Sequence, residues 1–487
     1  MVSGSTRTFD VILAYPRERV SAFYPMIPLG LANIAAVLEQ NNVSVKIIDF
    51  NFYRGDFQRD LKKWNPKIIG IGGTTITRKA SYSIANLAKK VFADVPVVYG
   101  GIHASFTAED TLKNIKEIDF VVKGEGEYTF LSLCEFFSGR DGDSIHDLPG
   151  LSYRNNNGYI HNKAERIDDL DELPLPARHL FNNQYKMKLD FVDAEADFLM
   201  TSRGCPHACT FCSASRMFPG GLRCRSAENV QSEVEYVLSQ KNIKALKLFD
   251  STFTASREHV LDFCKMIKPY NLLWECEVRA DTVDYELLRI MKEAGCCYID
   301  VGLETTDMEL LKKVNKRIHP KQVENILDWC RKLDIKTKVF FIFGILGQTY
   351  ESCLRDIDYI KNNENKIDFY STTIGMRVYP GTAIERKARQ LNLMPQDFSW
   401  ANYKSPKWNY LIYEFEDILI LNQKQLNYFK LFKIFLILLW RRHLASFGFI
   451  KDILILNSRR LFTGLWIKFK YLIFGIRRKA ESIFEKN

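Results

Sequence analysis

Cysteine is scarce in this chain. Eleven cysteines are spread over 487 residues, which is too few for the disulfide framework of a small secreted domain. Long apolar runs are also lacking, since the longest unbroken run in the C-terminal part is Ile434–Trp440, far short of the about 20 residues that a membrane span needs. The first ten residues are polar and do not resemble a secretory leader. We therefore expect a cytoplasmic protein whose clustered cysteines bind metal.

An excess of charge of one sign is missing from most of the chain. The formal net charge is +10, but residues 423–487 carry 14 basic and 3 acidic residues, whereas the remainder has 54 basic and 55 acidic residues. Because the positive charge is confined to one block, we expect no nucleic-acid partner. Apolar residues make up 46% of the chain, which is typical of a folded protein. Its length predicts two or three domains.

Short apolar runs alternate with amphipathic stretches in the first 140 residues. This pattern is typical of βαβ units around a buried parallel sheet. Five such units predict a doubly wound α/β domain, flavodoxin-like (Rossmann-like), whose ligand lies at the carboxyl ends of the strands. The predicted strands are Phe9–Tyr15, Val43–Asp49, Lys67–Gly72, Val95–Gly101 and Ile118–Lys123, and the predicted helices are Leu29–Gln40, Arg78–Phe92, Thr107–Ile115 and Tyr128–Phe137.

A second βα series follows a predicted hairpin, Leu151–Arg154 with Tyr159–Lys163, and an acidic, proline-containing linker. Six strand repeats are fewer than the eight of a closed barrel, so we predict a partial (β/α)6 barrel. The chain then divides into a domain at 8–142, a hairpin and linker at 143–190, a barrel at 191–420 and a basic amphipathic helical tail at 421–487. The predicted barrel strands are Phe198–Ser202, Ala245–Phe249, Trp274–Arg279, Tyr298–Glu304, Thr337–Gly344 and Tyr370–Met376.

Cys205, Cys209 and Cys212 form a CxxxCxxC triplet directly after the first predicted barrel strand. Barrel enzymes place their catalytic loops at this end of the strands. Three thiolates on one loop suit a [4Fe–4S] cluster whose fourth iron has no protein ligand. A zinc site is the alternative, but structural zinc needs four ligands, and His207 would have to supply the fourth from inside the triplet.

The triplet resembles that of the radical SAM superfamily, and the resemblance extends over about residues 191–420. It implies that the open iron of the cluster binds the amino and carboxylate groups of S-adenosylmethionine (SAM). It also implies that one electron from the cluster cleaves SAM to a 5′-deoxyadenosyl radical, which abstracts a hydrogen atom. An external electron donor, a flavodoxin or a ferredoxin, is then expected as a partner.

Other barrel segments resemble the parts of this family that hold SAM. Gly302-Leu303-Glu304 resembles the GLE segment, in which the glutamate meets the ribose. The segment 343–349 resembles the GxPGET-type turn near the adenine, with Leu346 and Gln348 in place of Pro and Glu, and 248–253 resembles an F-x-D-D-x-F segment. Arg279 is a candidate for the SAM carboxylate, with a structural arginine as the alternative. The resemblance thus implies SAM binding by Phe211, Arg279, Glu304, Gly344 and Gly347.

The first domain resembles the cobalamin-binding domain that precedes the radical SAM core in one large subgroup. The matching segments are 28–31, 70–75, 100–105 and 124–129, and glycines at strand ends let the backbone approach a large ligand closely. The sequence has no Asp-x-His-x-x-Gly segment, so we expect no histidine on cobalt; the alternative is a domain that has lost cobalamin and serves as scaffold. The candidate cobalamin-binding residues are Gly73, Thr74, Thr75, Gly100, Gly101, His103, Gly124, Glu125 and Glu127.

These resemblances imply a cobalamin-dependent radical SAM enzyme that methylates an unactivated carbon of a small molecule. A first alternative keeps the cofactors but performs oxidative cyclisation or rearrangement, as in the anaerobic magnesium-protoporphyrin ester cyclase branch. A second alternative is a non-catalytic cobalamin or iron–sulfur sensor.

The tail between Leu426 and Ile476 alternates apolar and basic blocks and carries Trp440, Trp466, Phe469 and Tyr471. Such segments are too short to span a bilayer but suit its surface. We expect peripheral binding to an anionic membrane, at the inner face, and a lipid or isoprenoid substrate reached from it. The alternative is a helical cap that packs on the barrel.

We predict that the full-length protein cosediments with anionic vesicles at low salt, because each basic residue near such a surface contributes about 1 kcal/mol. Neutral vesicles are the control, and high salt should release the protein. Protein that stays in the supernatant with anionic vesicles at low salt would identify the tail as a cap.

Overall fold

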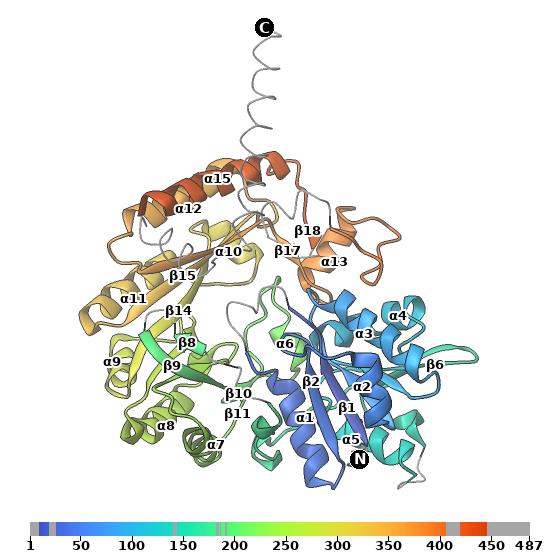
Figure 1. Cartoon of the computed structure of the whole chain (residues 1–487). Helices are drawn as coiled ribbons and strands as arrows, with labels where there is room; N and C mark the ends of the chain where they lie inside the picture. The colour runs from blue at the N-terminus through green and yellow to red at the C-terminus, as the bar shows by residue number, and fades with distance from the viewer. Residues whose placement is uncertain are drawn as a thin grey trace. The chain divides into compact units, whose positions relative to one another are not determined.

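The computed structural model describes residues 9–18, 26–139, 144–181, 185, 187–189, 192–405 and 419–445 (Figure 1). Residues 1–431 form one compact unit, and residues 432–487 form a second. The predicted surface-binding tail falls largely after residue 445, outside the described residues. In the part of the chain that the structure describes, no helix is both long and apolar enough to cross a bilayer.

The first domain is built on a seven-stranded sheet in the order β2-β1-β3-β4-β5-β6-β7. Its first five strands pair in parallel in the order 2-1-3-4-5, and this order confirms the predicted flavodoxin-like topology. The fully buried runs of these strands explain the pattern, because a parallel sheet is covered on both faces. The strands are β1 (Val11–Tyr15), β2 (Val45–Asp49), β3 (Ile68–Ile71), β4 (Val97–Tyr99) and β5 (Phe120–Val122).

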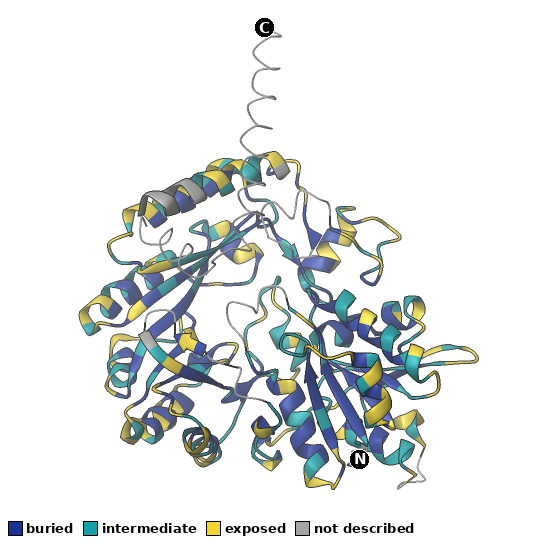
Figure 2. Cartoon of the chain, in the orientation of Figure 1, coloured by how far each residue is buried: buried dark blue, intermediate teal, exposed yellow. Residues whose placement is uncertain are grey.

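Helices cover both faces of this sheet, as the dark blue buried ribbon between them shows (Figure 2). Helices α1 (Leu29–Gln40) and α5 (Glu127–Phe137) pack on one face. On the other face lie α2 (Phe57–Trp64), α3 (Arg78–Val91) and α4 (Ile102–Asn114). The sequence pattern did not predict α2, and it began α4 five residues late.

The predicted hairpin forms from β6 (Leu151–Asn155) and β7 (Gly158–His161). Strand β6 pairs antiparallel with β5, so the hairpin extends the sheet of the first domain. The sequence did not predict this pairing. The alternation of apolar and polar residues within a hairpin indicates its two strands but does not identify the neighbouring strand of the sheet.

The second sheet has the order β16-β15-β14-β13-β12-β9-β8. Six of its strands pair in parallel, which confirms the partial (β/α)6 barrel, and the short β8 (Met187–Leu189) adds an antiparallel edge. The parallel strands are β9 (Val192–Leu199), β12 (Ala245–Leu248), β13 (Leu273–Val278), β14 (Cys296–Glu304), β15 (Lys336–Phe343) and β16 (Phe369–Ile374).

Amphipathic helices pack on the outer face of the barrel sheet, each following a strand (Figure 1). They are α7 (Ala227–Gln240), α8 (Arg257–Ile267), α9 (Tyr285–Glu293), α11 (Pro320–Leu333) and α12 (Tyr350–Asn362). The remaining α-helices and strands of the described chain are α6 (Ala214–Met217), α10 (Met308–Lys313), α13 (Ala383–Gln390), α15 (Tyr428–Ala445), and the paired strands β10 (Ser202–Arg203) with β11 (Arg223–Cys224) and β17 (Arg377–Val378) with β18 (Leu419–Ile420).

Two buried arginines join segments that are distant in the sequence. Arg178 lies after the hairpin and pairs with Asp197 of β9 at 3.1 Å and with Glu233 of α7 at 2.5 Å. Arg78 of α3 is fully buried and donates to the backbone carbonyls of Trp400 and Tyr403, at 2.8 and 3.0 Å. Arg178 therefore fixes the linker to the barrel, and Arg78 fixes the first domain to the segment that follows α13.

Candidate functional site

A cavity of about 440 Å³ lies at the carboxyl ends of the first domain's parallel strands. Its lining is largely apolar and includes Pro28–Leu31 before and within α1. Residues of the barrel complete the wall: Phe198, Met200, Arg203, Met217, Phe218 and Phe249. The cavity is therefore shared by the two sheets, and it occupies the position where doubly wound domains bind ligands.

Most of the predicted cobalamin-binding residues line this cavity, namely Gly73, Thr74, Gly100, Gly101, Gly124, Glu125 and Glu127. Gly101 adopts a φ of +95° and has no room for a side chain, because a Cβ would lie 2.7 Å from the carbonyl oxygen of Gly73. A left-handed φ with this close approach restricts the position to glycine. The backbone is thereby exposed along one wall of the cavity.

Thr75 and His103 lie outside the lining of this cavity as the described residues define it. His103 is fully buried, with Nδ1 3.1 Å from Oγ1 of Thr75 and Nε2 3.4 Å from the hydroxyl of Tyr82. Burial, assisted by the charge of Arg78, lowers the pKa of His103 to about 3. The imidazole is therefore a neutral core group that binds its neighbours with both nitrogens.

The loop between β5 and α5 is connected to the barrel by an ion-pair network. Glu125 accepts from Arg203 at 2.6 Å and from Arg223 at 2.8 Å, and Glu127 accepts from Arg203 at 2.7 Å. All four side chains are almost completely buried. Glu125 and Glu127 line the cavity, while Arg203 lies two residues before Cys205. The network thus joins the cavity of the first domain to the cysteine loop.

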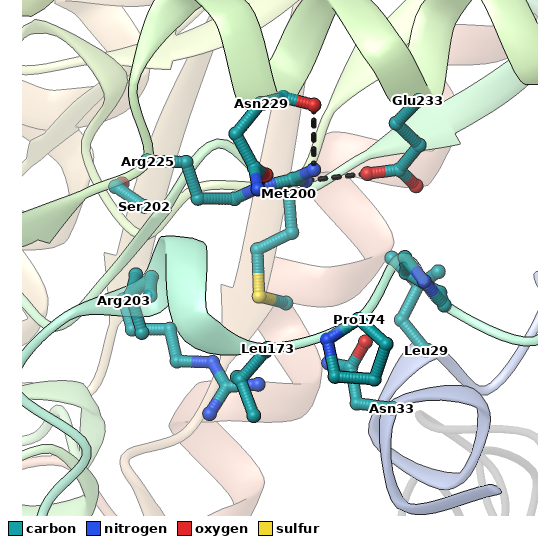
Figure 3. Close-up of a pocket in the computed structure, with 12 residues that line it drawn as sticks. Leu29, Asn33, Leu173, Pro174, Met200, Ser202, Arg203, Arg225, Asn229 and Glu233 are labelled. Atoms are coloured by element: carbon teal, nitrogen blue, oxygen red, sulfur yellow. Dashed lines mark hydrogen bonds and ion pairs between the residues drawn. The ribbon is translucent and has the colours of Figure 1, made fainter. Parts of the chain in front are cut away.

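A second, small cavity of about 30 Å³ lies beside the first and shares four of its lining residues. Figure 3 shows the side chain of Met200 extending between Arg225 and Leu173, with Arg225 held by Asn229 and Glu233. The volume suits one or two waters, so this cavity is too small for a cofactor.

The cysteine loop begins after β10 and is anchored to the barrel at several points. Thr210 donates its N–H to the carbonyl of Val314 at 2.9 Å and accepts from the N–H of Ile384 at 2.9 Å. The side chain of Asn315 donates to the carbonyl of Ala208 at 3.0 Å. All three bonds are made by protein groups alone, so the loop has a defined backbone path.

The three thiols face polar groups. Cys205 Sγ lies 3.6 Å from Oγ1 of Thr252, Cys212 Sγ accepts from the N–H of Ala214 at 3.5 Å, and Cys209 Sγ accepts from Arg279 at 3.7 Å. Burial raises the pKa of Cys209, while Lys316 and Arg279 act in the opposite direction. No group of three or more His, Cys, Asp or Glu side chains within the described ranges converges on a single-ion site.

Glu304 ends β14 beside this loop and forms an ion pair with Lys316 at 2.7 Å. Both side chains are buried. Burial by itself lowers the pKa of Lys316, but the charge and hydrogen bond of Glu304, together with Cys209, raise it overall above its ordinary value, so the lysine stays charged. Glu304 also has a φ of +71°, and a non-glycine residue in this strained region often marks a functional site. Sequence patterns did not single out Lys316, because it belongs to no motif.

Arg279 lies at the same end of the barrel, directly after β13. Its Nε pairs with Asp281 at 2.7 Å, and its Nη2 donates to the carbonyl of Lys316. Together with the contact to Cys209, these bonds bring Arg279, Lys316 and Glu304 to one side of the cysteine loop, as the sequence predicted for Arg279 and Glu304.

The other predicted SAM-binding residues have protein partners. The N–H of Gly344 donates to the side chain of Gln348 at 2.6 Å, and that of Gly347 donates to Gln423 at 2.8 Å. Gln348, which stands where the family pattern has a glutamate, also donates to the buried Asp356 at 2.9 Å. Phe211 packs on an apolar cluster that includes Ile345. These residues form the turn after β15 and the apolar surface beside the cysteine loop.

Comparison with known proteins identifies the family. The Radical SAM superfamily model matches residues 199–360, and the B12 binding domain model matches residues 19–133. The protein "Uncharacterized methyltransferase PH0819" of Pyrococcus horikoshii is 34% identical over 77% of this chain and 81% of its own length. The chain belongs to the radical SAM superfamily, and its first domain is a B12 binding domain.

Two further comparisons agree with this membership. The hopanoid C-3 methylase of Methylococcus capsulatus is 28% identical over 67% of this chain and 63% of its own length. The solved structure of the radical SAM methyltransferase TsrM from Kitasatospora setae, with cobalamin and a [4Fe–4S] cluster bound, superimposes with a TM-score of 0.66 at 22% identity, over 80% of this chain and 76% of that chain. That likeness confirms the fold.

The residues present fit the cofactors of a radical SAM enzyme with a B12 binding domain, namely a [4Fe–4S] cluster, SAM and cobalamin. A Cβ at Gly73 would lie 2.6 Å from Oγ of the buried Ser81, so this turn packs directly on the core and lines the cavity with backbone. Beside the cysteines, N–H donors and two cations face the thiols, and such partners stabilise thiolates. Nε2 of His207, inside the triplet, is buried without a hydrogen-bond partner in the described part of the chain.

Replacing Cys209 with alanine is expected to reduce the iron content well below the about four irons per chain of the anaerobically reconstituted protein. Two thiolates do not retain a site-differentiated cluster. Iron analysis and the brown absorbance measure the loss, and Cys224→Ala, in neighbouring β11, is the matched control. Full iron with SAM cleavage in Cys209→Ala would contradict the assignment.

Replacing Glu304 with glutamine is expected to weaken SAM binding about tenfold or more, because a hydrogen bond to a charged group contributes about 1.5–3 kcal/mol. The iron content should not change. Equilibrium dialysis with labelled SAM gives the affinity, and Glu309→Gln on the exposed start of α10 is the control. An unchanged affinity would mean that Glu304 serves only to neutralise Lys316.

Proposed function

We propose that this protein is a cobalamin-dependent radical SAM methyltransferase that acts on an unactivated carbon of a small molecule. The observation that carries the proposal is the cavity shared by the B12 binding domain and the barrel, which the Arg203 network connects to the cysteine loop. Two relatives, one named as a methyltransferase and one as a hopanoid methylase, support the reaction class.

The cofactors supply the chemistry when bound: the cluster donates an electron to SAM, and cobalamin carries the methyl group. The protein's own residues bind and orient these groups. Cys205, Cys209 and Cys212 hold the cluster, while Arg279, Glu304 and Lys316 provide charges for the polar parts of SAM. The glycine turns of the first domain present backbone to cobalamin.

The apolar wall between the two domains excludes water from the site. Phe198, Met217 and Phe249 of the barrel and Leu29 and Phe130 of the first domain line this wall. A dry site protects a radical from side reactions with solvent. An apolar lining of this kind also supports a substrate with an apolar body, and a lipid or isoprenoid presented at a membrane surface is one such substrate.

The products of SAM test the proposal. Reconstituted protein with SAM and a reductant, or a flavodoxin or ferredoxin donor, is expected to form 5′-deoxyadenosine together with S-adenosylhomocysteine. Deoxyadenosine alone would indicate the cyclase or rearrangement chemistry. Neither product would indicate a non-catalytic sensor.

The electron paramagnetic resonance spectrum of the Co(II) form is expected to lack nitrogen superhyperfine splitting from an axial imidazole or benzimidazole. For the imidazole, the reason is that His103 is buried away from the cavity and engaged at both ring nitrogens. His103→Phe should leave the spectrum of the bound cobalamin unchanged. Nitrogen splitting that disappears in this variant would contradict the expectation.

A further inference from the structure

The inner face of the barrel sheet is strongly charged. Trp274 of β13 faces the helices, because its ring lies 5.3 Å from Phe263 of α8. Side chains alternate along a strand, so Glu275, Glu277 and Arg279 point to the opposite, inner face. The parallel register sets Glu277 beside Asp300 of β14.

Three lysines near this face have carboxylate partners. Lys247 pairs with Glu275. Lys338 lies 3.7 Å from Asp300, and Lys316 lies 2.7 Å from Glu304 at the cysteine end. Arg279 is paired with Asp281. Among the residues that the structure describes, these cations already have carboxylate partners, and Glu277 is an additional negative charge beside them.

The carboxylate of Glu277 makes no hydrogen bond or ion pair with any described residue, although the side chain is accessible to solvent. Its pKa is nevertheless raised to about 7. Burial among surrounding protein is the main cause, and the charge of Asp300 adds to it, while Lys247, Lys316 and Lys338 act in the opposite direction. Since the side chain remains accessible to solvent, it is the alternation along β13 that places Glu277 on the inner face of the sheet, in a part of the barrel interior that is open to water.

The neighbours of Glu277 indicate what it faces. Lys247 of β12 is in register with Glu275, and extending this register by two residues places Phe249 beside Glu277. Phe249 is 44% exposed, its ring lies 6.0 Å from that of Phe198, and both line the cobalamin cavity. Towards the carboxyl end of β13, Arg279 follows Glu277 by two residues, which is about 7 Å along the strand. Arg279 in turn contacts Cys209.

We propose that Glu277 binds a protonated amine of the substrate, whose apolar body lies along Phe249 towards the cobalamin cavity. This inference rests on the proposed function and adds the substrate class, an amphiphilic amine. A bound cation neutralises the additional negative charge beside Asp300, which a neutral hydroxyl group does not. The ion pair also sets the distance between the amine and the end of the barrel where Arg279 meets Cys209.

Calorimetric titration of the reconstituted full-length protein with benzylamine tests the inference, with benzyl alcohol as the neutral probe of similar shape. We expect saturable binding of benzylamine at pH 8, at least tenfold weaker binding by Glu277→Gln, and retained binding by Glu277→Asp. Benzyl alcohol should bind both proteins equally weakly. Glu258→Gln, an exposed glutamate of α8, is the matched control, and iron content together with circular dichroism verifies that each variant is folded.

The pH dependence provides a second readout. Only the ionised carboxylate attracts the cation, and benzylamine stays protonated between pH 6 and pH 8. The affinity should therefore rise about tenfold over this range, as a group with a pKa near 7 ionises, and Glu277→Gln should lose this dependence. No saturable binding to the native protein, equal affinity in Glu277→Gln, or an equal effect on benzyl alcohol would overturn the inference. Because binding and not turnover is measured, such a result would leave methyl transfer untouched.

Discussion

The buried ion-pair network of Arg203 and Arg223 with Glu125 and Glu127 is the interaction on which the arrangement of the two cofactor sites depends. The carboxylates follow the last parallel strand of the B12 binding domain, and Arg203 precedes the cysteine loop of the barrel. Removing one partner from such a network leaves a buried charge without compensation, at a cost of about 3–5 kcal/mol. The two α/β domains are in this way held with their strand ends towards a common cavity.

Charge is balanced differently at the two ends of the barrel interior. At the cysteine end, Lys316 is neutralised by Glu304 and Arg279 by Asp281, so a ligand must share groups that are already paired. Deeper in the barrel, Glu277 is not paired. A polar ligand at the cysteine end has to replace existing ion-pair partners, whereas a cation at Glu277 forms a new ion pair. This difference separates the binding of a cofactor common to the superfamily from the binding of a substrate particular to this protein.

Much of the fold could be predicted because buried parallel strands and amphipathic helices produce regular patterns of apolar residues in the sequence. The bounds of α1, for example, are those that the sequence predicts. Helix α4 starts five residues earlier than predicted because Gly101 caps it and the backbone kinks at Thr107. The cofactor motifs predicted the cysteine loop, Arg279, Glu304 and the glycine turns as site residues, and the structure brings Arg279 and Glu304 to the end of the barrel that carries the cysteine loop. They did not identify Lys316 and Glu277, whose roles depend on which strands lie side by side. They also assigned Thr75 and His103 to the ligand, because a linear motif does not reveal that these side chains turn towards each other in the core.

The anchoring of the cysteine loop has a consequence for the maintenance of the enzyme. Bonds from Val314, Asn315 and Ile384 hold the loop through protein groups alone, so its backbone order does not depend on iron. Ordering a free loop would cost about 1–2 kcal/mol per residue, and here that cost is met during folding of the barrel. These three bonds need no iron, so we expect a chain that loses its cluster to oxygen to be repaired by the return of iron and sulfide rather than by refolding of the protein.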